Sequence, residues 1–150
     1  MISRHPSNPI LQASDIPYPA SLIFNAGVAK YQGRYVMVFR NDYGSTEEEW
    51  RPFKEGRADH PPALQTSLGL AFSDDGIKWD VQPTPCWKVA TGEIRRVYDP
   101  RITVIDGVAH ICFAMDTMHG VRGGIARTED FSRFDILSLS VPDNRNMVLF

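Results

Sequence analysis

The sequence is poor in cysteine, in excess charge and in long apolar runs, and each shortage excludes a class of protein. Only two cysteines, Cys86 and Cys112, occur among 150 residues, and they form no CxxC pair, so neither a disulfide framework nor a zinc ribbon is expected. The 16 basic and 18 acidic residues leave a net charge of −2, which provides no basic surface for nucleic acid or for an anionic membrane. No apolar run approaches the roughly 20 residues that a membrane-spanning helix needs.

Helical periodicity and an apolar leader are also missing. No 11-residue window has the apolar spacing of an amphipathic helix, and residues 46–50 could form one helical turn at most. Residues 1–6 lack the apolar stretch of a secretory signal. Cys112 lies in an apolar strand pattern, which favours a reduced, buried thiol. We therefore expect a cytoplasmic protein.

Short strands and turns make up most of the chain. A polar turn containing Gly33 precedes the aromatic and β-branched run 35–40, which is a hairpin signal. The same pattern returns at residues 102–113, where Asp106 and Gly107 separate two apolar runs. Together these features predict an all-β chain.

The strand pattern repeats. Each half reads as a strand, its hairpin partner, a third strand, an Asp-containing turn and a fourth strand. The aligned positions are Phe24 with Tyr98, Asn25 with Asp99, Gly33 with Gly107, Asp42 with Asp116, residues 69–75 with 124–130, and Trp79 with Phe134. The halves differ in length because residues 43–66 form a polar, proline-containing insert, which we predict to be a loop.

A repeated four-stranded antiparallel unit is typical of a β-propeller blade, and a β-sandwich is the alternative. The pattern predicts blade one at about residues 20–90, with the insert at 43–66, and blade two at about 95–142. Residues 144–150 resemble the start of a third blade. Because propellers close with about four to eight blades, we expect residues 1–150 to be the N-terminal part of one larger catalytic domain.

Polar residues stand where the innermost strand of each unit begins. Asn25, Asp99 and Arg145 would converge there from three neighbouring blades, as in a pocket for a sugar or a phosphate. Asp99 could act as a general acid, or it could accept backbone N–H bonds at a strand entry. Arg145 could bind an oxyanion with two N–H groups, or it could be a solvated turn residue.

Two other features allow less specific interpretations. Arg40 and Asp42 end the hairpin strand of the first unit and could form a surface ion pair of little energetic value. His119 has no second His or Cys at metal-ligand spacing, so no metal site is expected.

Several motifs together resemble glycoside hydrolase family 130, the β-mannoside phosphorylases and related enzymes. The resemblance covers nearly the whole chain. Within the family, the chain is most similar to the branch that acts on β-1,4-mannooligosaccharides or mannosyl-N-acetylglucosamine. The matching motifs are NPIL at residues 8–11, IFNAG at 23–27, GRYVMVFR at 33–40, SDDGIKW at 73–79, YDPRIT at 98–103 and NRNMVLF at 144–150.

The resemblance implies a five-bladed β-propeller that cleaves β-mannosides with inorganic phosphate, inverts the anomeric centre and releases α-mannose 1-phosphate. Phosphate is then a co-substrate, and no other cofactor is implied. By the same resemblance Asp99 is the general acid and acts through the 3-hydroxyl of the mannosyl unit. Asn25, Arg40 and, with weaker support, Asp42 hold that unit, Tyr98 lines the acceptor side, and Arg145 binds phosphate.

Two other functions stay open at this stage: a β-mannosidase that uses water, and a noncatalytic sugar-binding propeller. Family members often assemble, so a homo-oligomer is also compatible with the resemblance. The family's further phosphate ligands come from later blades, and we therefore expect residues 1–150 alone to be inactive. The insert at 43–66 would alter acceptor choice or subunit contacts.

Overall fold

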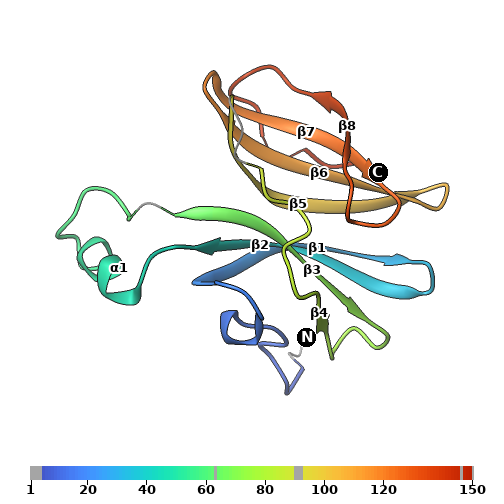
Figure 1. Cartoon of the computed structure of the whole chain (residues 1–150), viewed down its shortest axis with the longest axis horizontal. Coiled ribbons are helices and arrows are strands. Elements are labelled where there is room, and N and C mark those ends of the chain that lie inside the picture. Colours follow the sequence, from blue (N-terminus) through green and yellow to red (C-terminus); the bar gives the residue numbers. More distant parts are fainter. Residues whose placement is uncertain (1–4, 63, 90–92, 146, 150) are drawn as a thin grey trace, which may run out of the picture.

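Two four-stranded antiparallel sheets make up the molecule in a computed structural model, which describes residues 5–62, 64–89, 93–145 and 147–149 (Figure 1). Strand order within the sheets is β1-β2-β3-β4 and β5-β6-β7-β8, so each sheet is built from consecutive strands. The predicted all-β fold of two four-stranded propeller blades is confirmed. The elements are η1 (Ala13–Asp15), β1 (Leu22–Tyr31), β2 (Arg34–Tyr43), α1 (Glu47–Lys54), β3 (Gln65–Ser73), β4 (Asp80–Val81), β5 (Ile94–Ile105), β6 (Val108–Thr117), β7 (Gly120–Thr128) and β8 (Asp135–Leu139).

The first hairpin of each sheet turns through two residues in the left-handed region. Gln32 and Gly33 have φ values of 49° and 85°, and Asp106 and Gly107 have 49° and 78°. Two positive φ angles in a row match the twist of the flanking strands, and in both turns a polar residue followed by glycine adopts them. Both hairpins were predicted at these positions.

A phenylalanine lies across a glycine at the same place in both sheets. Phe39 pairs with Gly69 between β2 and β3, and Phe113 pairs with Gly124 between β6 and β7. A Cβ at either glycine would lie 2.2 or 2.3 Å from the phenylalanine ring. The repeat therefore extends from the backbone to the packing of individual side chains.

The main core lies between the two sheets. Trp87, which follows β4, packs edge-on against Phe113 and stacks on Phe134. The distances between ring centres are 4.9 and 4.5 Å. The face-to-face packing of the two sheets brings the inner strands β1 and β5 together (Figure 1). Core residues with at most 2% of their surface exposed are Val36, Val38, Leu68, Val97, Ala109, Ile111, Phe113, Met115, Ala126 and Phe131.

The insert contains a helix, and the prediction of a loop with one helical turn at most was wrong. α1 (Glu47–Lys54) begins at a capping box in which Thr46 Oγ1 accepts from the Glu49 N–H and the Glu49 carboxylate accepts from the Thr46 N–H. Acidic residues in the first turn and Lys54 in the last complement the helix dipole. α1 stands away from the two sheets (Figure 1).

No helix in the described ranges combines the length and the apolarity that crossing a membrane requires.

Candidate functional site

Two equivalent β-bulges position the central residues of the site. The register of β1 shifts between Phe24 and Gly27, and that of β5 shifts between Tyr98 and Arg101. Within these bulges Asn25 has a φ of 50° and Asp99 a φ of 54°. Asn and Asp adopt this left-handed conformation more readily than other side chains, and a bulge redirects the side chain that it carries.

The two bulged residues meet across the blades. Asn25 Nδ2 donates to Asp99 Oδ1 at 2.9 Å, although the residues lie 74 positions apart in the chain. This contact brings together two of the three residues that the repeat placed at blade entrances.

Arg40 joins the two carboxylates of the site. Its Nη1 lies 3.3 Å from Asp99 Oδ1, and its Nε and Nη2 bind the two oxygens of Asp42 at 2.9 and 2.7 Å. Thr66 Oγ1 also donates to Asp42 at 2.7 Å. The Arg40 and Asp42 side chains are 14% and 2% exposed, so this is a buried pair and not a surface one.

The electrostatics of Arg40 follow from these partners. Burial alone would lower the pKa of the guanidinium, but hydrogen bonds and charge attraction from Asp42, and then from Asp99, outweigh it and raise the pKa. Arg40 is therefore a permanent cation that orients both carboxylates.

Asp99 has one bound oxygen and one available oxygen. Its side chain is 12% exposed. Both of its side-chain hydrogen bonds reach Oδ1, from Asn25 and Arg40, and no residue in the described part of the chain bonds Oδ2. A carboxyl group fixed in this way can present its second oxygen to a ligand hydroxyl.

A small cavity of about 110 Å³ lies beside Asp99. Arg101 and Phe113 line it from the second blade, and Met147 and Val148 line it from the C-terminal segment. It has room for a few water molecules or another small polar group. The cavity connects the carboxyl with the segment that was predicted to begin a third blade.

Tyr98 is buried beneath the site, with 2% of its surface exposed. Its hydroxyl donates to Asp116 Oδ1 at 2.8 Å, and the guanidinium groups of Arg40 and Arg96 lie 5.0 and 4.9 Å from its ring centre. Burial, followed by the hydrogen bond and charge of Asp116, raises its pKa to about 12. The Tyr98 ring therefore packs against the Arg40 guanidinium. Contact between Tyr98 and a sugar remains a prediction.

Phe24 provides the exposed aromatic surface beside Arg40. Its ring centre lies 4.6 Å from the Arg40 guanidinium, and 38% of its surface is exposed.

Arg145 lies at the surface in the C-terminal segment. Its positive charge acts on Tyr98, where it lowers the pKa and partly offsets the effect of burial. The segment passes β5, because Thr103 Oγ1 donates to the Leu149 carbonyl at 3.0 Å. Asn146 and Phe150, which belong to the same predicted blade start, lie outside the described residues.

The structure thus joins five of the predicted site residues in one network of contacts: Asn25, Arg40, Asp42, Tyr98 and Asp99. Arg145 is not among these contacts, and it lies at the surface of the C-terminal segment. Sequence reasoning did not assign roles to Phe24, Thr66 or Asp116. The repeat held a signal for two of them, because it aligned Asp42 with Asp116 and Phe24 with Tyr98. Among the described residues no group of three or more His, Cys, Asp or Glu side chains could hold a metal ion.

Comparison with known proteins identifies a family. The family model of glycoside hydrolase family 130, described as β-1,4-mannooligosaccharide phosphorylase, matches residues 3–144. A β-1,4-mannooligosaccharide phosphorylase from Ruminococcus albus is 29% identical over 161 aligned residues, which cover 100% of this chain and 42% of that protein. The chain therefore spans less than half the length of this relative.

Solved structures show the same fold. β-1,2-Mannobiose phosphorylase from Listeria innocua, in complex with β-1,2-mannobiose, superposes with a TM-score of 0.70 at 19% identity, over 89% of this chain and 49% of that one. A structure from work on family 130 glycoside hydrolases that target β-1,2 mannosidic linkages in Candida mannan gives a TM-score of 0.66 at 19% identity, over 89% and 39% of the two chains.

Proposed function

The chain belongs to glycoside hydrolase family 130, and from this membership we propose that the protein cleaves β-1,4-mannosides with inorganic phosphate, with inversion, and releases α-mannose 1-phosphate. The observation that carries the proposal is the hydrogen bonding of the Asp99 carboxyl group. Asn25 and Arg40 hold its Oδ1, while its Oδ2 has no partner in the described ranges. The β-1,4 linkage is supported by the description of the family model and by the relative from Ruminococcus albus.

The proposed reaction needs one acid and one anion site. Asp99 donates a proton to the 3-hydroxyl of the mannosyl unit, and that hydroxyl passes its own proton to the glycosidic oxygen. A phosphate oxygen attacks C1 from the opposite face while the bond from C1 to the glycosidic oxygen breaks. The acceptor leaves as a neutral alcohol. Ordinary inverting hydrolysis uses a second carboxylate to activate a water molecule. In the proposed reaction phosphate takes the place of that carboxylate and of the water.

The neighbours of Asp99 orient this acid and hold the mannosyl unit. Asn25 and Arg40 keep one carboxyl oxygen in place, which leaves the other directed to the sugar. Asp42 is held by Arg40 through two bonds and in turn positions that side chain beside the mannosyl unit. The exposed ring of Phe24 can lie against a sugar face.

Arg145 is the proposed phosphate ligand on this chain. A guanidinium binds two oxygens of a phosphate with parallel N–H bonds, and the exposure of Arg145 leaves those donors accessible.

The test uses the protein expressed from its complete reading frame, because the chain covers 42% of its curated relative. Incubation with β-1,4-mannobiose should give α-mannose 1-phosphate, observed by ³¹P NMR, only when phosphate is present. Asp99→Asn should lower kcat by about 10²- to 10⁴-fold, the usual contribution of a positioned general acid. Asp106→Asn is the matched control, since Asp106 also has a positive φ, 49°, but lies in the β5–β6 turn. Absence of phosphate-dependent product would refute the proposal.

A β-mannosidase of the same family is the second candidate, favoured by the family 130 hydrolases among the structural neighbours. Arg145→Ala separates the two. A phosphorylase should show a higher KM for phosphate, whereas a hydrolase should release mannose at an unchanged rate with or without phosphate. A noncatalytic sugar-binding propeller would turn over no mannoside and would keep its affinity in Asp99→Asn.

A further inference from the structure

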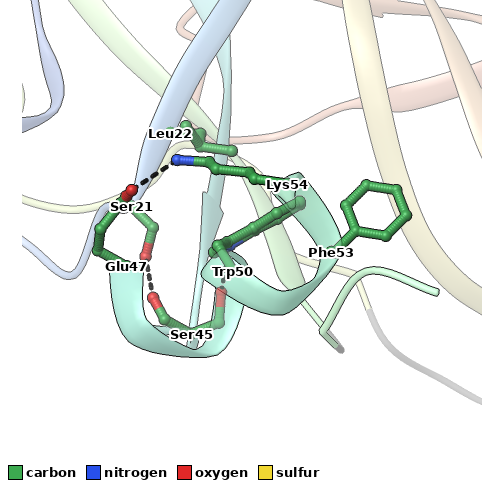
Figure 2. A pocket seen from close by; sticks show the side chains of 7 residues that line it. All are labelled: Ser21, Leu22, Ser45, Glu47, Trp50, Phe53 and Lys54. Carbon is green, nitrogen blue, oxygen red and sulfur yellow. Dashed lines mark hydrogen bonds and ion pairs between the residues drawn. The ribbon is translucent and has the colours of Figure 1, made fainter. Parts of the chain in front are cut away.

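A hollow of about 500 Å³ lies between the start of β1 and the insert helix α1. Figure 2 shows Leu22, Trp50 and Phe53 lining it with apolar side chains, and Ser21, Glu47 and Lys54 lining it with polar ones. This volume is within the range of small-molecule and sugar sites.

The side chains of the hollow contribute little to the core of the fold. α1 has no buried residue, and Leu22 and Phe53 are 43% and 38% exposed. Exposed large apolar side chains that are gathered around one hollow indicate a binding surface more often than a packing one.

The aromatic lining is nevertheless held in place. Trp50 Nε1 donates to Ser45 Oγ at 2.8 Å, and Ser21 Oγ donates to the Ser45 carbonyl at 2.8 Å. These bonds tie α1 to the chain just before β1 and fix the edge of the indole ring. A ring oriented in advance loses little conformational entropy when a ligand covers it.

An exposed apolar line connects the hollow with the Asp99 site. In the β1–β2 ladder Leu22 is opposite Asp42 and Phe24 is opposite Arg40. Directly opposite residues share a face of the sheet, so Leu22 and Phe24 lie on the face that carries Arg40 and Asp42. Leu22 is three residues before Asn25, or about 10 Å along an extended strand. A chain of linked sugars that leaves the Asp99 site can follow this line.

We propose that the hollow is a distal subsite for the outer sugar units of a β-mannoside oligosaccharide. This inference rests on the proposed function. Trp50 and Phe53 offer flat surfaces to the apolar faces of the sugar rings, and Ser21, Glu47 and Lys54 offer hydrogen bonds to hydroxyl groups. Lys54 Nζ lies 2.7 Å from Glu47 Oε1, so the rim charges are paired, which suits a neutral ligand.

The experiment is a chain-length series on the complete protein. KM and kcat are measured for phosphorolysis of β-1,4-mannosides of two to five units. We expect KM to fall about tenfold, equivalent to about 1.4 kcal/mol, once the substrate is long enough to reach the hollow, with little change in kcat. Trp50→Ala and Phe53→Ala should each remove most of this gain and leave disaccharide kinetics unchanged. Arg51→Ala is the control, because Arg51 is exposed on the same helix and does not line the hollow.

Each alternative has its own outcome. An equal KM for all lengths in the wild type would overturn the subsite while leaving phosphorolysis intact, whereas no phosphate-dependent turnover on any length would refute the proposed function itself. Loss of disaccharide turnover in Trp50→Ala would place that residue in the reacting site and would also overturn the subsite. A second copy of the chain is the alternative occupant of the hollow, and sedimentation velocity tests it. If Trp50→Ala forms smaller assemblies than the wild type but keeps the preference for longer substrates, the hollow is a subunit contact and the subsite is overturned.

Discussion

The two blades have one backbone plan and different chemistry at equivalent points. Each has a bulge in its first strand, with a positive φ at Asn25 in one and at Asp99 in the other. The amide of the first then donates to the carboxylate of the second. Repetition of the backbone therefore brings two chemically complementary groups to one point, and the side chains alone decide which blade supplies the proposed acid.

The blades also differ in how deeply their Arg–Asp pair is buried. In blade one the Arg40 and Asp42 side chains are 14% and 2% exposed, and in blade two those of Arg96 and Asp116 are 34% and 26% exposed. The buried pair touches Asp99, whereas the more exposed pair reaches the site through Tyr98. Blade one therefore holds the site with a buried ion pair, and blade two carries Asp99, the proposed acid.

Breaking the two Arg–Asp pairs should give the largest contrast in stability. Arg40→Ala leaves the buried Asp42 with a hydroxyl as its remaining side-chain partner, so the free energy of unfolding should fall by about 3–5 kcal/mol. Arg96→Ala removes a partly solvated pair and should cost about 0–1 kcal/mol. Urea unfolding followed by tryptophan fluorescence measures both. Similar losses in the two variants would contradict the proposed difference between the blades.

The shared packing of the blades predicts equal, intermediate effects at two glycines. Gly69→Ala and Gly124→Ala each place a methyl group against a phenylalanine ring and should each cost about 1–3 kcal/mol. Phe39→Leu combined with Gly69→Ala should cost less than the sum of the single changes, because the smaller side chain makes room for the methyl group. Additive losses would show that the ring and the glycine are not in the contact described.

A last difference, confined to alkaline pH, should appear at Tyr98. Folding raises the pKa of Tyr98 from 10.0 to about 12, mainly through burial, so the folded state holds this proton more tightly than the unfolded chain does. The stabilisation is complete below about pH 10 and is lost as pH rises toward 12. Tyr98→Phe should therefore lose less stability than the wild type between pH 10 and 12, measured by urea unfolding at a series of pH values. Identical losses would show that Tyr98 does not titrate in this range.

Much of the fold could be predicted from the sequence because hairpin turns and strand periodicity are local signals. The alignment of Asn25 with Asp99 and of Gly33 with Gly107 corresponds to matching backbone angles in the structure. The helix α1 had a local signal too, Thr46 followed by Glu49, but Pro52 and the polar composition favoured a loop. Pro52 removes one backbone N–H bond and crowds the Glu48 carbonyl, yet the capping box at Thr46 and Glu49 still starts a helix of two turns.

The contacts of the site could be predicted only in part. Asn25 and Asp99 were assigned to neighbouring blade entrances, but the hydrogen bond between them depends on the angle at which the blades pack. The burial of Tyr98 under two guanidinium groups depends on Arg40 reaching across from the other blade. Long-range side-chain geometry of this kind leaves no periodic trace in the sequence.

The inner strands pack tightly at a residue that has no side chain. A Cβ at Gly27 would lie 2.9 Å from the Ile102 nitrogen and 3.0 Å from the Arg101 Cα, so the backbones of β1 and β5 nearly touch. Gly27 is two residues from Asn25, and Arg101 is two residues from Asp99. Any larger residue at position 27 would separate the strands next to the bond between the amide and the carboxylate. The alignment of the proposed acid therefore depends on the absence of a side chain at position 27.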